Sequence, residues 1–203
     1  LSVGSFAQDN EYVEEVVSIG TRGKPRSVSS SPVPVDVLSA EDISKTGTDD
    51  LLMQLQGSIP SLNVHLQPIS DAASMIRPAN LRGLSADSTL ITTNGKRRHH
   101  ASVIAFQGGG VNDGSQGADI SVIPAIALKR VEVLRDGASA QYGSDAIAGV
   151  INFVLDDISE GGSLSYKMGE YTEGDGATTN IAGKYGMPLG QDGFVTTSFQ
   201  IRQ

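Results

Sequence analysis

A run of small residues between two strand-like segments is the feature that most constrains the fold of this 203-residue chain. It lies in residues 128–155, LKRVEVLRDGASAQYGSDAIAGVINFVL. Both ends of the segment are rich in Val, Ile and Leu, as β-strands are. The middle holds small residues where a soluble enzyme would carry a larger hydrophobic load: Gly137, Ala138, Ser139, Ala140, Gly143, Ala146, Ala148 and Gly149. Small side chains let backbone approach backbone. Gly137 and Gly143 can take positive φ at turns, and we expect a short, slim helix between them.

Composition removes several classes of function. The formal net charge of −8 argues against nucleic acid as the main partner, because phosphate binding needs a concentrated cationic face. The sequence has no cysteine, which excludes disulfides, iron–sulfur clusters, thiolate zinc sites and cysteine nucleophiles. No run approaches the ~18 apolar residues that a membrane-spanning helix requires. Any role at a membrane must therefore be peripheral or depend on strands.

The first ten residues, LSVGSFAQDN, contain an apolar stretch that ends in a small-x-small pattern. Ser5, Phe6 and Ala7 are followed by polar residues, which resembles the tail of a secretory signal peptide cut after Ala7. We therefore interpret residues 1–7 as a signal-peptide remnant. The alternative is a frayed terminus.

Residues 8–31 combine a β-branched patch with a Ser/Pro-rich tract. Val16, Val17 and Ile19 favour an extended strand. The glycines and prolines that flank this strand are expected to deny it a packed hairpin partner nearby. The pattern predicts a strand on a flexible tether, and the alternative is an ordinary edge strand of the domain that follows.

A compact α/β unit is predicted next. A short valine-rich strand precedes a helical turn at residues 40–43, which Ser39 can cap, with Asp42 at the third position as in a capping box. Thr48 is expected to cap a second helix over residues 49–56. The buried stripe of that helix would consist of Leu51, Leu52 and Leu55.

Turn signals divide the middle of the chain. Asn94 followed by Gly95 is the strongest of them and predicts a hairpin over residues 88–97. Between residues 97 and 117 the sequence is too irregular for regular structure. The other expected elements are short strands at 61–66 and 79–84, a helical turn at 123–127 and a strand at 128–134.

From Gly161 onward, three segments of about nine residues are separated by Gly-rich turns. They are SLSYKMGEY (163–171), TTNIAGKYG (178–186) and FVTTSFQIR (194–202). In the first, apolar residues at 164, 166 and 168 alternate with polar residues at 165 and 167. Strands of ~9–11 residues with this alternation are typical of an outer-membrane barrel wall. A soluble antiparallel sheet has the same period.

Taken in order, these stretches resemble the plug domain of TonB-dependent outer-membrane receptors followed by the first strands of their barrel. The matching stretches are EEVVSIGTR (14–22), PVPVDVLSAEDISKTGTDDLLMQLQGSIPSLNV (32–64), LRGLSADSTLITTNGKRRH (81–99) and, most specific, IPAIALKRVEVLRDGASAQYGSDAIAGVINFVL (123–155). The resemblance covers nearly everything from residue 14 on. One departure is Thr92 and Thr93, where the family usually has apolar residues before the turn.

The resemblance implies an α+β plug domain, with a small mixed sheet and short helices, followed by the first antiparallel strands of a transmembrane β-barrel. It divides the chain into a signal-peptide remnant (1–7), a TonB box and flexible linker (8–31), the plug (32–157) and the first barrel strands (158–203). A plug fills the lumen of a barrel of about 22 strands, so it meets another protein wall on every side. Three strands cannot close a lumen, and we therefore expect the chain to be the amino-terminal part of a longer receptor.

The implied function is TonB-dependent active transport of a scarce nutrient across the outer membrane of a Gram-negative bacterium, with the plug gating the barrel lumen. The nutrient would be a ferric siderophore, cobalamin or an oligosaccharide. The implied partners are TonB with ExbB and ExbD in the periplasm, the receptor's own barrel and the small-molecule ligand. TonB would capture a strand of this chain by β-augmentation. The residues expected to form that strand are Glu15, Val16, Val17, Ser18 and Ile19.

Two arginines match positions that the family pairs with barrel carboxylates. They are Arg82 and Arg135. A guanidinium fork can hold two carboxylates in fixed geometry, which suits a reversible lock between plug and barrel. The alternative is that each arginine pairs inside the plug, for instance with Glu132 or Asp136.

Ligand contacts in this family come from loops at the apical end of the plug. The cationic candidates are Arg97, Arg98, His99 and His100, which suit a ferric siderophore or another anionic ligand. The candidates in the loop at residues 108–117 are Asn112, Asp113 and Gln116, which suit a glycan. The alternative is a solvated loop tip. Adjacent histidines point to opposite sides of a strand, so we expect no metal site and no cofactor.

Two other classes of protein compete with this interpretation. The sequence has no GxSxG, HExxH or P-loop motif, so we do not expect an enzyme. The second class is a soluble periplasmic binding or interaction module. The strand-like segments after Gly161 separate this class from a receptor, because a soluble module has no reason to continue with them.

Overall fold

The computed structural model describes Val16, Val17, Ile19, Arg26, Ser27, residues 34–45, Thr48 and residues 50–64, 73–106, 110–172 and 174–203. Its centre is a five-stranded mixed sheet in the order β3-β8-β9-β6-β7. These strands are β3 (Val35–Ser39), β8 (Leu128–Leu134), β9 (Gly149–Leu155), β6 (Thr89–Thr93) and β7 (Lys96–Arg97). The β6 and β9 strands run parallel, and every other neighbouring pair is antiparallel.

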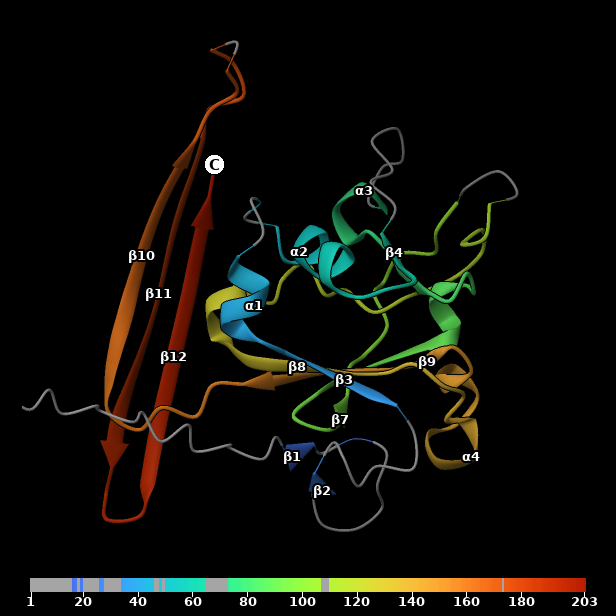
Figure 1. The fold of residues 1–203 in the computed structure, drawn as a ribbon, viewed down its shortest axis with the longest axis horizontal. Helices are drawn as coiled ribbons and strands as arrows, with labels where there is room; N and C mark the ends of the chain where they lie inside the picture. Colours follow the sequence, from blue (N-terminus) through green and yellow to red (C-terminus); the bar gives the residue numbers. More distant parts are fainter. Residues whose placement is uncertain are drawn as a thin grey trace, which may run out of the picture.

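Two helices cover one face of this sheet (Figure 1). They are α1 (Ala40–Ser44) and α2 (Leu51–Ser58). The cap of α1 is confirmed, since the Ser39 side chain accepts a hydrogen bond from the Asp42 amide. The expected cap of α2 is wrong by two residues: Asp50 caps the helix by accepting from the amides of Leu52 and Met53. The hydroxyl of Thr48 instead accepts from the Asp50 amide, because the Asp50 carboxylate satisfies two free amides of the first turn and Thr48 lies two residues before the cap.

Short elements complete this side of the sheet. They are β4 (Leu62–Val64), which pairs with β5 (Ala79–Leu81), the helix α3 (Ala73–Ile76), and the 3₁₀ turns η2 (Ala86–Ser88) and η3 (Ala125–Ala127). The main core lies between the sheet and this layer. Its fully buried members include Leu52, Leu55, Leu81, Val131 and Phe153.

A second, smaller core lies on the opposite face of the sheet. It contains Val17, Ile19, Val35, Leu90, Leu134, Ala146 and Val150. Side chains alternate between the two faces of a strand, so in β9 Val150 joins this core and Ile151 joins the main one. The same alternation assigns Leu90 and Ile91 of β6 to opposite faces.

The run of small residues folds as predicted in part. It forms α4 (Ser139–Tyr142) and the 3₁₀ turn η4 (Ser144–Ala146), and Gly143 has a φ of +102°. Gly137 does not take a positive φ, whereas Gly149 has a φ of +148°. At Gly149 a Cβ would overlap the carbonyl oxygen of Leu134 on the neighbouring strand. The tight backbone approach is therefore at the start of β9, where only glycine fits.

The hairpin turn is confirmed. Asn94 and Gly95 join β6 to β7 with φ of +49° and +73°, the positive pair that a type I′ turn requires. The Asn94 side chain also accepts a hydrogen bond of 2.9 Å from the Leu155 amide. The turn is thereby tied to the end of β9.

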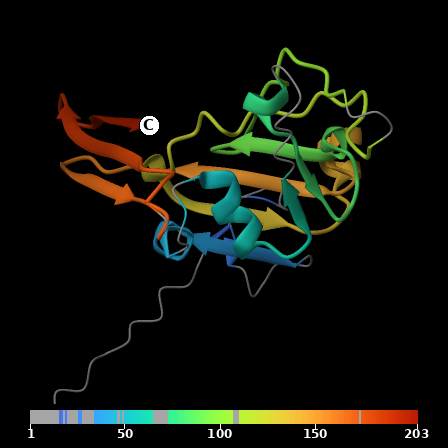
Figure 2. The ribbon, with the colours of Figure 1, turned by 90° about the horizontal axis from the view of Figure 1, so that it is seen from above.

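Three long strands form a separate antiparallel sheet beside this domain (Figures 1 and 2). They are β10 (Gly161–Gly169), β11 (Thr178–Leu189) and β12 (Gly193–Arg202). The predicted alternation holds: Leu164, Met168 and Phe199 are at least half exposed, while polar side chains line the side toward the plug sheet. Within the described part of the chain, no helix has the length and apolar character needed to cross a membrane.

Candidate functional site

The strand predicted to be captured by a partner is packed against the sheet. Val16–Val17 forms β1, which pairs antiparallel with β2 (Arg26–Ser27). The side chains of Val17 and Ile19 are 0% and 2% exposed and belong to the second core. Glu15 and Ser18 lie outside the described residues.

The expectation that this strand lacks a packed hairpin partner is therefore wrong. The physical reason is the apolar row Leu90, Val150, Leu134 and Val35, which crosses four strands of the sheet in register and needs a cover. Val17 and Ile19 supply part of that cover. The β1–β2 pair is a two-stranded sheet of its own, so β1 is not an edge strand of the five-stranded sheet either.

A second row of side chains on the same face is polar and buried. Thr92, Asn152 and Glu132 lie opposite one another on β6, β9 and β8. The Thr92 hydroxyl donates to Asn152 at 2.8 Å, and the Asn152 amide donates to Glu132 at 3.1 Å. Arg130 closes the row with a 2.8 Å ion pair to Glu132, which is 0% exposed. This network explains why Thr92 stands where the family usually has an apolar residue.

The two predicted lock arginines occupy different environments. Arg135 donates a 2.9 Å hydrogen bond to Asp36 on β3 and forms an ion pair with the same carboxylate. Arg82 lies 3.9 Å from Asp136, and both side chains of this pair are about half exposed. Arg135 thus has an acidic partner within its own domain, although that partner is Asp36 rather than Glu132 or Asp136.

The four predicted cationic contacts are not equally available. Arg97 donates to the carbonyl of Tyr142 at 2.6 Å and forms an ion pair with Asp145. Arg98 donates to the carbonyl of Asp119 at 2.7 Å. His99 and His100 are exposed, and a ring nitrogen of His100 contacts the carbonyl of Gln116. Both arginines therefore brace the loop against neighbouring segments.

Residues 101–106 and 110–117 form two irregular stretches that bond to each other, and we call them the arm. The amide of Ala101 donates to Gly117 at 3.0 Å, and that of Ala105 donates to Ser115 at 2.8 Å. Asn112 is 0% exposed and exchanges two 2.5 Å hydrogen bonds with Asn80. Asn112 therefore holds the arm to β5 and presents no surface to solvent.

The arm exposes polar and apolar side chains together. Asp113 is exposed, and Gln116 is partly buried with its amide donating to Ala101. The sequence analysis did not identify three exposed apolar side chains of the arm: Ile104, Phe106 and Val111, with Phe106 80% exposed. The mostly apolar stretch SVIAF (102–106) could have indicated them, because no other stretch of the arm has an apolar pattern that would cover it.

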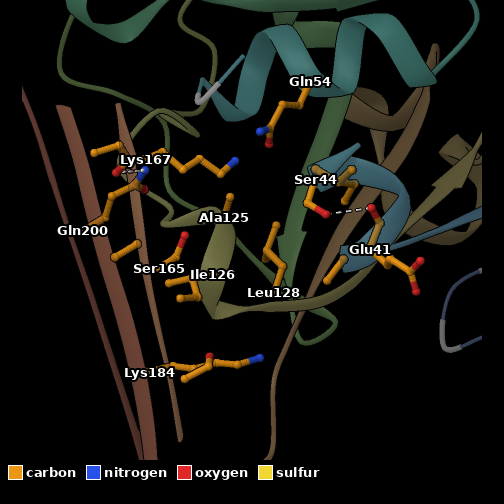
Figure 3. Close-up of a pocket in the computed structure, with 15 residues that line it drawn as sticks. Glu41, Ser44, Gln54, Ala125, Ile126, Leu128, Ser165, Lys167, Lys184 and Gln200 are labelled. Carbon is orange, nitrogen blue, oxygen red and sulfur yellow. Dashed lines mark hydrogen bonds between the residues drawn. The ribbon is translucent and has the colours of Figure 1, made fainter. Parts of the chain in front are cut away.

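A cavity of about 330 Å³ separates α1, α2 and η3 from the three long strands (Figure 3). Gln54 on α2 and Lys167 on β10 point into it from opposite sides. Gln54 is 3% exposed and donates to the carbonyl of Thr48 at 2.6 Å, while its own carbonyl oxygen has no partner among the described residues. The cavity between the two sheets is thus lined largely by polar side chains.

Ion pairs join the long strands β11 and β12 to the domain beside them. Asp50 accepts from Arg202 of β12 at 3.3 Å, and Asp156 pairs with Lys184 of β11. Asp50 also pairs with Arg77 at 2.7 Å. Burial alone would raise the pKa of Asp50, but the hydrogen bond and charge of Arg77, the Met53 amide and the charge of Arg202 together hold that pKa below its usual value.

Among the described residues, no group of three or more His, Cys, Asp or Glu side chains is placed to hold a metal ion. The described geometry thus consists of a packed β1–β2 pair, an arm with exposed side chains and a polar border between two sheets.

Comparison with known proteins places the fold. The family model described as the TonB-dependent receptor plug domain matches residues 27–150. The iron-regulated outer membrane virulence protein of Vibrio cholerae serotype O1 is 29% identical over 154 residues, 75% of this chain and 22% of that protein. The ferric enterobactin receptor of Pseudomonas aeruginosa is 32% identical over 120 residues, 59% of this chain and 16% of that protein.

A solved structure is similar over most of the chain. It is a mutant of the ferric enterobactin receptor from Pseudomonas aeruginosa in complex with enterobactin, with a TM-score of 0.65 at 26% identity. The similarity covers 84% of this chain and 24% of that one. The chain therefore spans about a fifth of the length of the curated relatives it matches.

Proposed function

Because the chain belongs to the TonB-dependent receptor plug-domain family, we propose that it is the plug and first wall strands of an outer-membrane receptor that imports a ferric siderophore with energy from TonB. The observation that carries the proposal is the match of the plug model to residues 27–150, with β10–β12 following from Gly161 on. Relatives of the chain are an iron-regulated outer membrane protein and a ferric enterobactin receptor. They favour a siderophore over cobalamin or an oligosaccharide.

The sheet of β10–β12 supports a place in the outer membrane of a Gram-negative bacterium. Its outer face carries exposed apolar side chains, among them Leu164, Met168, Phe199 and Ile201. Such a face suits the hydrocarbon core of the bilayer, while the polar face suits a lumen filled by the plug. A soluble periplasmic module would leave this apolar face in water, so the face argues against that alternative.

TonB capture requires the partner strand to leave its packed position. We propose that Glu15, Val16, Val17, Ser18 and Ile19 form the strand that TonB, driven by ExbB and ExbD, augments from the periplasm. Val17 and Ile19 are buried in the second core, and full burial of such a side chain is worth about 1.5–3 kcal/mol each. The packed position therefore restrains the strand until that free energy is supplied.

Ligand contact is proposed for the exposed residues of the arm and of the segment just before it. His99 and His100 precede the arm, Phe106 and Asp113 belong to it, and all four side chains are exposed. Arg97, Arg98 and Gln116 already make hydrogen bonds within the protein, and we propose that they contact the ligand through their remaining polar atoms. Asn112 supports the arm from inside, so its contribution to binding is indirect.

The lock between plug and barrel is proposed for Arg82 and Arg135. Arg82 is the more available of the two, since its side chain is 44% exposed and its nearest acid is 3.9 Å away. Arg135 would have to exchange Asp36 for a barrel carboxylate. A guanidinium group can serve two carboxylates at once, so this exchange does not require the first pair to break completely.

The test is nutrient-limited growth with the complete reading frame. A deletion strain would be given ferric siderophores, cobalamin or oligosaccharides as sole sources, and complemented with the intact gene. We expect complementation to restore growth and radioactive iron uptake on at least one ferric siderophore, and only in cells with functional TonB. Restoration limited to cobalamin or oligosaccharides, or uptake that persists without TonB, would contradict the proposal.

A further inference from the structure

One carboxylate of the plug collects contacts from three directions. Asp50 caps α2 through one oxygen, which accepts from the amides of Leu52 and Met53 at 3.0 and 3.3 Å. Its other oxygen faces Arg77, just after α3, at 2.7 Å and Arg202 of β12 at 3.3 Å. A single side chain thus links the start of a plug helix, a second plug segment and a long strand outside the plug sheet.

The Asp50 carboxylate is largely shielded from solvent, so water and salt weaken its ion pairs less than they weaken pairs on the surface. The side chains of Asp50 and Arg77 are 16% and 13% exposed, and both line, together with Arg202, a second cavity of about 200 Å³. Arg202 is 47% exposed, so its charge is partly solvated. Arg77 therefore fixes the carboxylate in place, and Arg202 can engage or release it.

The polarity of the contact is the reverse of the predicted arginine lock. In both ion pairs that join described residues across the border, the acid belongs to the plug and the base to the long strands: Asp50 with Arg202 and Asp156 with Lys184. Asp156 lies in the segment that connects β9 to β10, so chain connectivity already keeps its pair close. The Asp50–Arg202 pair has no such help, because 152 residues separate its members.

We propose that Asp50 is an anchoring site by which the plug holds wall strand β12, with Arg202 as its partner and Arg77 as the residue that orients the carboxylate. The inference rests on the proposed function, in which β10–β12 are barrel wall. Breaking this contact loosens α2 and the segment after α3 from the wall without touching Arg82 or Arg135. The anchor and the arginine lock are thus separate holds on the same plug.

The test uses the full-length receptor in planar lipid bilayers, with urea added to the plug side. The measured quantity is the urea concentration at which channel conductance appears. Asp50→Asn removes the charge and keeps a side-chain oxygen for the cap, and Arg202→Gln removes the partner charge. The matched control is Lys45→Gln, which breaks an exposed pair with Glu41 on α1 that does not reach the wall.

We expect Arg202→Gln to lower the urea midpoint, and Asp50→Asn to lower it at least as much because this change also breaks the pair with Arg77. The double variant should lower the midpoint no further than Asp50→Asn alone. Lys45→Gln should leave the midpoint unchanged. An unchanged midpoint in Asp50→Asn, or single effects that simply add, would overturn the proposal.

A cross-linking experiment separates the failure of the anchor from the failure of the proposed function. The 203 residues contain no cysteine, so in a receptor whose remaining cysteines are replaced by serine an Asp50→Cys and Arg202→Cys pair can be joined by a flexible bismaleimide. We expect an internal cross-link in that pair and none between Asp136→Cys and Arg202→Cys, because Asp136 follows the far end of β8. A wild-type receptor that conducts without urea contradicts the plugged barrel. Absence of the cross-link contradicts the anchor, whatever the conductance.

Discussion

Gly149 lies so close to Leu134 that a Cβ on the glycine would overlap the leucine's carbonyl oxygen and come within 2.8 Å of a methyl group of Leu81. The glycine starts β9 next to the fully buried Ala146 and Ala148. Larger side chains at these positions would separate β9 from β8 and from the main core. The packing of the plug's own strands thus requires these small residues. Small residues also suit a domain that is enclosed by a barrel wall.

Replacement of Gly149 should therefore destabilise the protein. We expect Gly149→Ala to cost about 1–3 kcal/mol in the free energy of unfolding, because the methyl group meets backbone and φ is +148°. The control is Gly137→Ala, where φ is not positive and the nearest atom is 3.4 Å from the new Cβ. Urea denaturation of both variants measures the difference. Equal stability of the two variants would show that the approach at Gly149 is not restrictive.

The threonine pair before the hairpin turn allows a matched comparison. The Thr92 hydroxyl donates to the buried Asn152, whereas the buried hydroxyl of Thr93 has no partner among the described residues. Valine has nearly the same shape and lacks the hydroxyl. We expect Thr92→Val to cost about 0.5–1.5 kcal/mol and Thr93→Val to be neutral or stabilising. Equilibrium unfolding in urea gives both values. A larger loss of stability in Thr93→Val than in Thr92→Val would contradict a stabilising role for the buried hydrogen bond of Thr92.

Local signals in the sequence predicted several local elements correctly, although they misplaced the cap of α2 and the positive φ of Gly137. The cap of α1 depends on Ser39 and Asp42, which are three residues apart, and the turn at Asn94 and Gly95 depends on two adjacent residues. The strands β8 and β12 depend on side-chain alternation. In each case the residues that decide the structure are neighbours in the chain, so a pattern reveals them.

Long-range contacts decided what the sequence did not predict. Arg135 finds Asp36 across 99 residues, and β1 packs on the sheet because Leu90, Val150 and Leu134 form an apolar row only after three strands align. The buried position of Asn112 likewise depends on Asn80, 32 residues earlier. No pattern within a short window contains these pairs. Only the structure therefore distinguishes the candidate residues that support the arm, such as Asn112, from those that are exposed to a ligand.

Acid should weaken the fold through Asp50. The pKa of its carboxyl is lowered in the folded protein, so the ionised form stabilises the fold fully above the unfolded-state pKa, about 3.9. This stability is lost as the pH falls from that value through the lowered pKa. We expect the free energy of unfolding to decrease between about pH 4 and the lower pKa, and Asp50→Asn to flatten that decrease. Urea titrations at a series of acidic pH values test this, and an identical slope in the variant would contradict it.

The most direct test of the central claim is a comparison of ligand binding and energised uptake in Val17→Pro. Proline removes the amide that a captured strand needs, and Val17 packs in the second core, whose described members include no residue of the arm. With radioactive ferric siderophore and intact cells, we predict that Val17→Pro retains surface binding and loses TonB-dependent uptake, while Val17→Ile retains both. Uptake by Val17→Pro at the wild-type rate would contradict the account.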